Sequence, residues 1–257
     1  MKIYILILMC LPLLVAAQTP AERGLEIAIE ADQYDTGFGD SSSQMMMTLK
    51  NANGDISVRK MTSKTLEVNG DGDKGLTVFK EPADIKGTAF LSFTHVLDAD
   101  DQWLYLPALK RVKRISSKNK SGPFMGSEFA FEDLSSREVP KYTYEFLREE
   151  SVAGEECYVL ETKPNYKHSG YTRSIVWISK KILQPIKVDY YDRKNSLLKT
   201  MTASEFNQYL GQYWRPHQML MVNHQTKKET RLDFSNYEFK TGLTDRSFNK
   251  SSLKRAR

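Results

Sequence analysis

The sequence predicts a mainly β fold of the α+β class, in which a strongly curved antiparallel sheet carries helices on its concave face. Apolar and polar residues alternate with period two over most of the chain, which is typical of strands. Short polar turns join these segments, and links of that length connect antiparallel neighbours. Because a flat open sheet rarely exceeds ~10 strands, a dozen or so strands must curl. A curved sheet closed over a helix can contain an apolar ligand.

The composition is that of a folded protein. Of the 257 residues, 40% are hydrophobic and 27% are charged, which excludes a disordered or low-complexity chain. The formal net charge of +5 is too small to indicate nucleic-acid binding in a chain of this length. The presence of two cysteines rules out a disulfide framework.

The N-terminus has the pattern of a secretion signal. Lys2 supplies a positive charge, the stretch Ile3–Leu14 is almost entirely apolar, and small residues end at Ala17. A membrane anchor needs about 18 or more consecutive apolar residues, and this run is shorter. We therefore predict that residues 1–17 are a signal peptide cleaved after Ala17, that the protein is exported, and that residues 18–257 form a single domain.

The segment after the predicted cleavage site has the pattern of an amphipathic helix. Thr19 can cap the helix, Pro20 suits its first turn, and Glu22 can reach back to the cap. Because the pattern stops before Gly37, we expect a helix over 20–35 that lies on an apolar surface. Its apolar face is expected to contain Leu25, Ala28 and Ile29.

Beyond this helix, alternating segments predict the strands. A first strand around 45–49 is followed by the turn 53–54 and a returning strand. The segments 88–97 and 171–179 are apolar on both faces, so we expect both faces of the sheet to be covered there. A second helical pattern occurs at 127–137. The remaining strands are expected at 76–80, 102–106, 111–115, 142–149, 156–162, 185–191, 196–206, 217–225 and 229–239.

No pattern indicates catalysis, a metal site or a cofactor. The four histidines form no ligand pair at helical spacing, and no nucleophile motif or nucleotide-binding fingerprint occurs. The loop 69–75 has Lys74 where a calcium loop requires glycine, so it is interpreted as a polar turn. Cys157 is interpreted as a buried structural thiol on a strand. We expect no enzyme activity, no cofactor and no metal.

A basic stretch without any acidic residue lies at 110–120. It leaves two interpretations open: a solvated hairpin, or a docking surface for an acidic partner or for lipid headgroups. Because it lacks interleaved aromatic residues for base stacking, it does not favour nucleic acid. The candidate docking residues are Lys110, Arg111, Lys113 and Arg114.

Two long segments carry a family resemblance, namely Asp101–Ile115 and Lys120–Phe129. Shorter matches lie at 169–173, 190–194, 214–215 and 223–226. From about residue 20 to 255, the chain resembles the outer membrane lipoprotein-sorting protein family, a LolA-like group often found with RND-type exporters. The resemblance implies an unclosed β-barrel with helices in its concave side. LolA-type carriers hold acyl chains in that cavity and move them across the periplasm.

The candidate cavity lining follows from the assumption that the apolar strand faces are concave. Each methylene that water reaches costs about 0.8 kcal/mol, which is why a lipid needs a protein-lined cavity to cross an aqueous gap. The loop bracketed by Gly122 and Gly126 carries Phe124 and Met125, and we expect it at the cavity mouth, moving when cargo enters. The candidate lining is Met45, Met47, Leu49, Leu104, Leu106, Ile175, Trp177, Met219 and Met221.

The leading hypothesis is a periplasmic carrier that binds a lipid or lipoprotein acyl chain and works with an inner-membrane RND-type exporter. We expect it to act as a monomer and not to bind nucleic acid. One alternative is a periplasmic sensor or regulatory module, similar to RseB-like proteins that bind a membrane signalling partner. A second is a hydrolase, for which the sequence offers no convincing pair of nucleophile and base.

Overall fold

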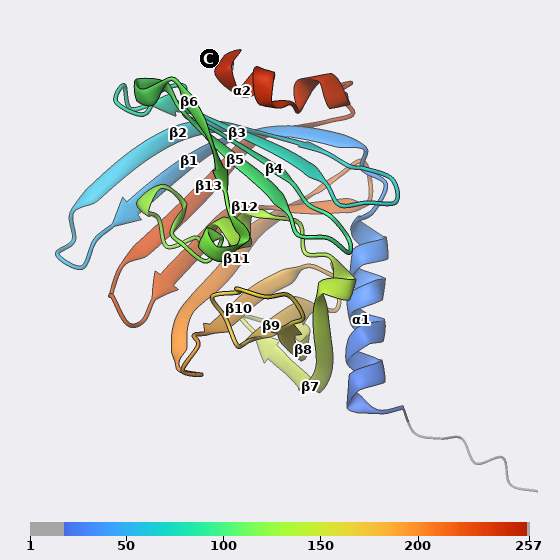
Figure 1. Ribbon diagram of the computed structural model, residues 1–257. Coiled ribbons are helices and arrows are strands. Elements are labelled where there is room, and N and C mark those ends of the chain that lie inside the picture. Colours follow the sequence, from blue (N-terminus) through green and yellow to red (C-terminus); the bar gives the residue numbers. More distant parts are fainter. Residues whose placement is uncertain (1–17, 256–257) are drawn as a thin grey trace, which may run out of the picture.

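The computed structural model describes residues 18–255, and the predicted signal peptide at 1–17 lies outside the described residues. The described chain contains one antiparallel sheet of 13 strands with two α-helices (Figure 1). The helices are α1 (Pro20–Asp35) and α2 (Lys250–Arg255). The strands are β1 (Asp40–Lys50), β2 (Ile56–Leu66), β3 (Lys74–Glu81), β4 (Ala89–Phe93), β5 (Asp101–Leu106), β6 (Arg111–Ile115), β7 (Tyr142–Val152), β8 (Glu155–Pro164), β9 (Arg173–Ser179), β10 (Pro185–Tyr191), β11 (Leu197–Tyr209), β12 (Tyr213–Asn223) and β13 (Glu229–Phe239).

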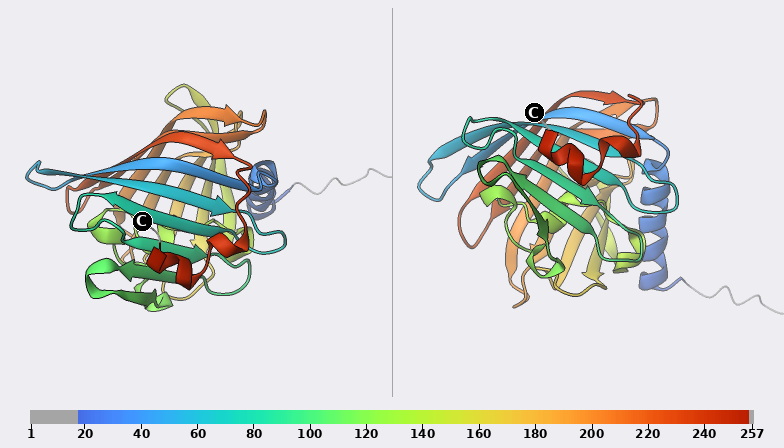
Figure 2. Two further views of the ribbon diagram at one scale, coloured as in Figure 1. Left: turned by 90° about the horizontal axis from the view of Figure 1, so that it is seen from above. Right: turned by 45° about the horizontal axis from the view of Figure 1, so that its top comes forward.

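The sheet is strongly curved but is not closed into a barrel, which confirms the predicted fold class (Figures 1 and 2). The strand order is β6-β5-β4-β3-β2-β1-β13-β12-β11-β10-β9-β8-β7. Successive strands are neighbours, so the chain forms two meanders that join where β1 pairs with β13. The two free edges are β6 and β7. The connection between them, residues 116–141, crosses the concave side and packs its aromatic side chains there.

Helix α1 begins where the sequence predicts. The Glu22 N–H donates to the Thr19 hydroxyl at 3.2 Å, and the Thr19 N–H donates to the Glu22 carboxylate at 2.8 Å, which forms a capping box. The helix lies along the edge strand β7 (Figure 1). Its buried residues include Ile27 and Ala28, whereas Leu25 and Ile29 of the expected apolar face are exposed. Neither helix among residues 18–255 combines the length and apolar character that a membrane span requires.

Gly24 allows α1 to approach β7 closely. A Cβ atom built there would lie 2.8 Å from the backbone nitrogen of Phe146 and 2.9 Å from that of Glu145. Real Cβ atoms do not approach backbone so closely, so glycine sets the distance between the helix and this edge. The helix thereby covers the unpaired edge of β7, which would otherwise be open to another strand.

Apolar clusters cover both faces of the sheet. The largest occupies the concave side. On the outer face, α2 covers a cluster over β3, β4 and β5 that includes Leu91, Trp103 and Leu253. A third cluster, over β8 and β9, also lies on the outer face. Burial on both faces of β4 and β9 was predicted from their continuous apolar runs, whereas α2 was not anticipated.

The prediction of a helix at 127–137 is wrong. The range contains a 3₁₀ turn at Phe131–Leu134, and another 3₁₀ turn precedes it at Phe124–Gly126. Between them, the Glu128 N–H donates to the Thr230 hydroxyl on β13 at 2.9 Å. The segment is therefore shaped by its contacts with the sheet, and those contacts override its local helical pattern.

Candidate functional site

A cavity of about 800 Å³ lies between α1 and the concave face of the sheet. We call it the α1 cavity. Cavities that bind small ligands measure about 300–1,000 Å³, so this one has an ordinary size for a binding site. Ala28 and Ala31 of α1 and Phe129 of the β6–β7 connection form part of its wall. Its apolar floor comes from β8 to β12 and consists of Leu160, Val176, Ile178, Val188, Met201 and Met219.

Strand register arranges this floor. Leu160 pairs with Val176, Val176 pairs with Val188, and Val188 pairs with Met201. Met201 in turn faces Met221 on β12. Because side chains directly opposite on antiparallel strands share a face, the five residues form a continuous apolar row across β8 to β12. Such a row suits a long hydrocarbon group lying across the strands.

Carboxylates gather along another part of the α1 cavity. They are contributed by the C-terminal half of α1, the turn after β2 and the β6–β7 connection. Burial raises the pKa of Asp73 to about 6. Burial and the nearby charge of Asp73 raise the pKa of Glu138 to about 7. Burial also raises the pKa of Asp35, although Arg215 lies 2.5 Å away. The negative charge of this region therefore falls as the pH drops below neutrality.

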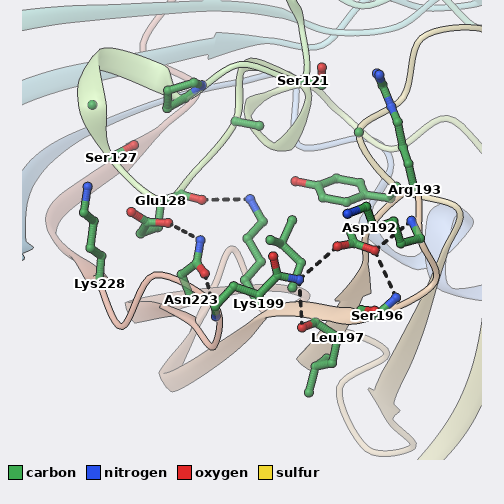
Figure 3. A pocket seen from close by; sticks show the side chains of 18 residues that line it. Ser121, Ser127, Glu128, Asp192, Arg193, Ser196, Leu197, Lys199, Asn223 and Lys228 are labelled. Atoms are coloured by element: carbon green, nitrogen blue, oxygen red, sulfur yellow. Dashed lines mark hydrogen bonds between the residues drawn. The ribbon is translucent and has the colours of Figure 1, made fainter. Parts of the chain in front are cut away.

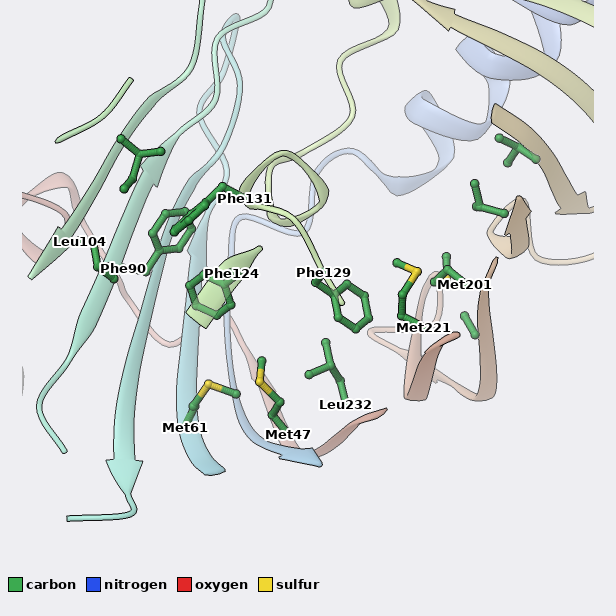
Figure 4. Close-up of a cluster of buried hydrophobic side chains, with 14 of the residues drawn as sticks. Met47, Met61, Phe90, Leu104, Phe124, Phe129, Phe131, Met201, Met221 and Leu232 are labelled. Atoms are coloured by element: carbon green, nitrogen blue, oxygen red, sulfur yellow. The ribbon is translucent and has the colours of Figure 1, made fainter. Parts of the chain in front are cut away.

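The β6–β7 connection fills the other half of the concave side. The Phe124 ring lies 5.3 Å from that of Phe90 and 5.5 Å from that of Phe131, measured between centroids. Phe129 lies farther along, beside Leu232 and facing Met221 (Figure 4). Aromatic packing therefore occupies the concave side under β2 to β5, and the α1 cavity occupies the side under β8 to β12.

The loop with Phe124 and Met125, which was expected at the cavity mouth, packs into the concave side of the sheet. Phe124 is 2% exposed and belongs to the core packing, and Met125 is half-buried. The Met125 carbonyl accepts a hydrogen bond from Arg59 at 2.5 Å. The structure thus places the pair inside the concave packing. Glycine and proline marked a turn correctly, but they carry no information on whether its apolar tip faces solvent or the core.

The residues expected to line a cavity divide between the two faces. Ile175 and Trp177 lie in the outer cluster with Cys157 and Val159, so they do not face the concave side. The alternation of β9 instead sends Val176 and Ile178 inward. Of the remaining candidates, Met219 lines the α1 cavity. The others contribute to the concave packing: Met45, Met47, Leu49, Leu104, Leu106 and Met221.

The predicted docking residues lie together at an edge of the sheet. Lys110 ends the turn before β6, and Arg111, Lys113 and Arg114 are on β6 itself. All four are exposed. Arg114 pairs with Asp101 on the neighbouring strand at 2.5 Å. The stretch is therefore a solvated basic edge whose charges are accessible.

A second, polar cavity of about 1040 Å³ lies where the β6–β7 connection meets the turns after β10 and β12 (Figure 3). Lys199 extends from β11 and donates to the Glu128 carbonyl at 2.7 Å. The Asn223 amide donates to the Glu128 carboxylate at 2.7 Å. These bonds hold the connection on the sheet. No sequence pattern indicated this arrangement, because its members are distant along the chain.

Neither cavity contains an arrangement typical of a metal centre. Within residues 18–255, no group of three or more His, Cys, Asp or Glu side chains could hold a metal ion. Burial raises the pKa of Cys157 to about 11, so this thiol is protonated at neutral pH and is a poor nucleophile. Together, an unclosed antiparallel sheet, a helix beside its open edge and an apolar concave cavity define the class of proteins with a LolA-like fold.

Comparisons with known proteins agree with that class. A lipoprotein-sorting protein domain of Vibrio parahaemolyticus, so named provisionally, is 58% identical over 91% of this chain and 100% of its own, with a TM-score of 0.90. A DUF1329 family protein of Desulfovibrio piger is 33% identical over 92% of this chain and 100% of its own, with a TM-score of 0.87. The chain therefore belongs to the outer membrane lipoprotein-sorting protein family.

Other comparisons are broader. A LolA superfamily protein of Nitrosomonas europaea is 22% identical over 89% of this chain and 98% of its own, with a TM-score of 0.71, which shows a shared fold. A family model described as "Uncharacterized protein" matches residues 71–255. No curated protein matches the chain.

Proposed function

We propose that this protein is a periplasmic carrier that holds a lipid or lipoprotein acyl chain in the α1 cavity and moves it between membranes. The observation that carries the proposal is the continuous apolar row on the cavity floor, from Leu160 to Met201. The name of the Vibrio parahaemolyticus relative, which refers to lipoprotein sorting, supports the same function.

The physical reason is the cost of exposing hydrocarbon to water. Each methylene that leaves water gains about 0.8 kcal/mol, so a Val, Leu, Ile and Met floor favours an acyl chain. Methionine is flexible and polarisable, which suits cargo of varied apolar shape. Met201 and Met219 lie on this floor. The acidic region beside it would keep one side of the cavity hydrated.

The test is to fill the cavity from its floor. Met219 and Leu220 are neighbours on β12 and both are half-buried, but Met219 lines the cavity and Leu220 points to the other face. We expect Met219→Trp to reduce both the lipid that co-purifies with the protein, measured by mass spectrometry, and the uptake of N-phenyl-naphthylamine. Leu220→Trp is the matched control and should behave as the wild type. Equal retention in the two variants would refute lipid binding in this cavity.

A carrier and a sensor differ in what happens to the bound lipid. A carrier releases its cargo to acceptor vesicles, and release should depend on the acceptor concentration. A sensor instead binds a protein domain with an affinity that changes when lipid is bound. Transfer of a fluorescent lipid from the loaded protein to vesicles therefore separates the two. We also propose that the protein has no catalytic activity, which incubation with ester substrates checks.

We further propose that the protein is exported by a signal peptide at 1–17 and acts as a monomeric, single-domain partner of an inner-membrane RND-type exporter. The exposed basic edge at β6 would dock on an acidic surface of that exporter. Replacing Lys110 and Lys113 with Glu should weaken binding to the purified exporter and reduce its salt dependence. The same reversal at Lys64 and Lys240, which are exposed elsewhere, should leave binding unchanged. Equal loss in both pairs would point to net charge alone.

A further inference from the structure

Arg137 is an exceptional charge in the α1 cavity. It is the single cation among the described residues that line this cavity. Its guanidinium donates to the Thr162 hydroxyl at 2.5 Å and lies over the Tyr142 ring, 4.3 Å from the centroid. A further hydrogen bond joins it to Tyr144. Arg137 is an exposed residue, so its guanidinium is accessible to a ligand from the cavity that it lines.

Two other cations on the concave side have carboxylate partners. Lys199 pairs with Asp133 at 2.7 Å, and Arg215 pairs with Asp35 at 2.5 Å. Arg137 makes no ion pair within 4.0 Å in the part of the chain that the structure describes. Because Arg137 is exposed, its charge needs no internal partner and remains available to a ligand. A guanidinium has five N–H donors in a planar fork, and its recorded partners, two hydroxyls and an aromatic ring, leave it without an opposite charge.

The surroundings of Arg137 combine donors with apolar surface. Thr162, Tyr144 and Tyr190 also line the cavity and bring hydroxyl groups to this part of the wall. On β8, Thr162 lies two residues from Leu160, so both side chains share the concave face. The donor-rich wall therefore continues directly into the apolar row that begins at Leu160. An oxygen-bearing group at Arg137 would leave its attached chain on that row.

We propose that Arg137 anchors the carboxyl oxygens of an acyl chain in the α1 cavity. The shared chemistry is the carboxyl group, whether it is the carboxylate of a free fatty acid or the carbonyl of an acyl ester. The inference rests on the proposed function and adds the group that the cavity recognises. The lining carboxylates cannot serve as donors when ionised, so they favour placement of the acyl oxygens at Arg137 and the hydroxyl groups beside it.

The test compares three probes that differ in their polar end: dansyl-undecanoic acid, its methyl ester, and N-phenyl-naphthylamine, which has no carboxyl group. The mature protein is titrated with each at constant pH 8 and its fluorescence is recorded. Arg137→Met keeps the length of the stem and removes the charge, and Arg137→Lys keeps the charge without the fork. Arg148→Met is the control, because Arg148 lies exposed on β7.

We expect Arg137→Met to weaken binding of the acid about tenfold or more, since a charge-assisted hydrogen bond is roughly twice as strong as a neutral one. Binding of the ester should weaken less, and binding of N-phenyl-naphthylamine should not change. Arg137→Lys should restore part of the affinity for the acid. If only the acid loses affinity, the source of the carboxyl group is a free fatty acid. If the acid and the ester both lose affinity, the cavity also recognises acyl esters.

Three results would overturn the proposal. If Arg137→Met binds the acid and the ester as tightly as the wild type, Arg137 is no anchor, while binding of N-phenyl-naphthylamine would still support the carrier. If the variant loses all three probes equally, Arg137 maintains the cavity shape and does not recognise a carboxyl group. If the wild type binds none of the probes, the carrier function fails and the anchor with it.

Discussion

Lys199 and Asp133 form an ion pair of 2.7 Å in which each side chain is 4% exposed. Lys199 comes from the middle of the sheet, on β11, and Asp133 from the connection that joins the two free edges, β6 and β7. Asp133 also accepts hydrogen bonds from the Ala130 N–H at 2.7 Å and from the Tyr171 hydroxyl at 2.8 Å. The pair therefore fastens the connection to the concave face and helps to keep the sheet curved.

The first prediction concerns this pair. Lys199→Met leaves a buried carboxylate without its cation, which costs about 3–5 kcal/mol in the free energy of unfolding. Urea unfolding followed by circular dichroism measures the change. The control is Arg231→Met, because the side chains of Arg231 and Asp233 are 45% and 27% exposed and surface pairs contribute about 0–1 kcal/mol. Adding Asp133→Asn to Lys199→Met should recover part of the loss, and an unchanged or greater loss would contradict an electrostatic origin.

The second prediction concerns the approach of α1 to β7. Alanine in a helix is normally more favourable than glycine by about 1 kcal/mol. At Gly24 the added methyl would meet the backbone of Phe146 at 2.8 Å, so the helix must shift from the edge. We expect Gly24→Ala to lower the free energy of unfolding by about 1–3 kcal/mol and to speed hydrogen exchange in β7. Gln33→Ala, at an exposed position of α1, should be neutral or stabilising. If Gly24→Ala were more stable than the wild type, the contact between α1 and β7 would be loose.

The third prediction concerns Asp73 and Asp71, two aspartates whose pKa values shift in opposite directions. Burial raises the pKa of Asp73 from 3.8 to about 6. The folded state therefore binds more protons than the unfolded state in this window, so the contribution of Asp73 to stability falls as the pH rises from about 4 to about 6. Asp73→Asn should be more stable than the wild type at pH 8, by up to about 3 kcal/mol at about 1.4 kcal/mol per pKa unit. At pH 4 most of this difference should disappear.

Asp71 is the control for that experiment. A hydrogen bond with His95, 2.7 Å long, lowers the pKa of Asp71 to about 2. Its stabilising contribution is present above pH 3.8 and is lost as the pH falls toward 2. Asp71→Asn should therefore be less stable than the wild type at pH 8, the opposite sign from Asp73→Asn. Thermal melts of both variants across pH provide the comparison, and equal signs would disprove the assignment.

The fourth prediction concerns the aromatic packing of the β6–β7 connection. Phe124→Ala should lower the free energy of unfolding by about 3–5 kcal/mol, as for other buried phenylalanines. Met125→Ala should cost less, because Met125 is half-buried. Chemical unfolding gives both values. If Phe124→Ala cost no more than Met125→Ala, the segment would be loosely packed and free to move, as expected from its sequence.

Much of the fold was predictable from local patterns. The capping residues of α1, the short polar turns and the alternation of the strands each report on neighbours along the chain, so the elements fell close to their predicted places. The errors have a physical cause. Residues 127–137 have a helical pattern, but Glu128 bonds to Thr230 and Asp133 to Lys199, partners far away in the sequence. Tertiary hydrogen bonds outweigh a weak helical preference.

The candidate site was predictable in kind but not in position. An apolar floor on a curved sheet was expected, and the structure places Met219 on the floor of the α1 cavity. On β9, however, both faces are apolar, so alternation could not distinguish Ile175 and Trp177 from Val176 and Ile178. Arg137 was not among the predicted site residues, because a lone arginine in a sequence resembles any surface arginine. Its distinguishing feature is the absence of a carboxylate beside it within the described residues.

The amino-acid pattern was sufficient to determine a curved antiparallel sheet, its helix start and an apolar interior, because these depend on residues a few positions apart. Folding in three dimensions decided which strand face is concave, which aromatic side chains fill it, and where the α1 cavity remains. Those outcomes depend on which side of the sheet the 116–141 connection crosses. That choice is set by packing and by ion pairs between distant residues, which no local period encodes.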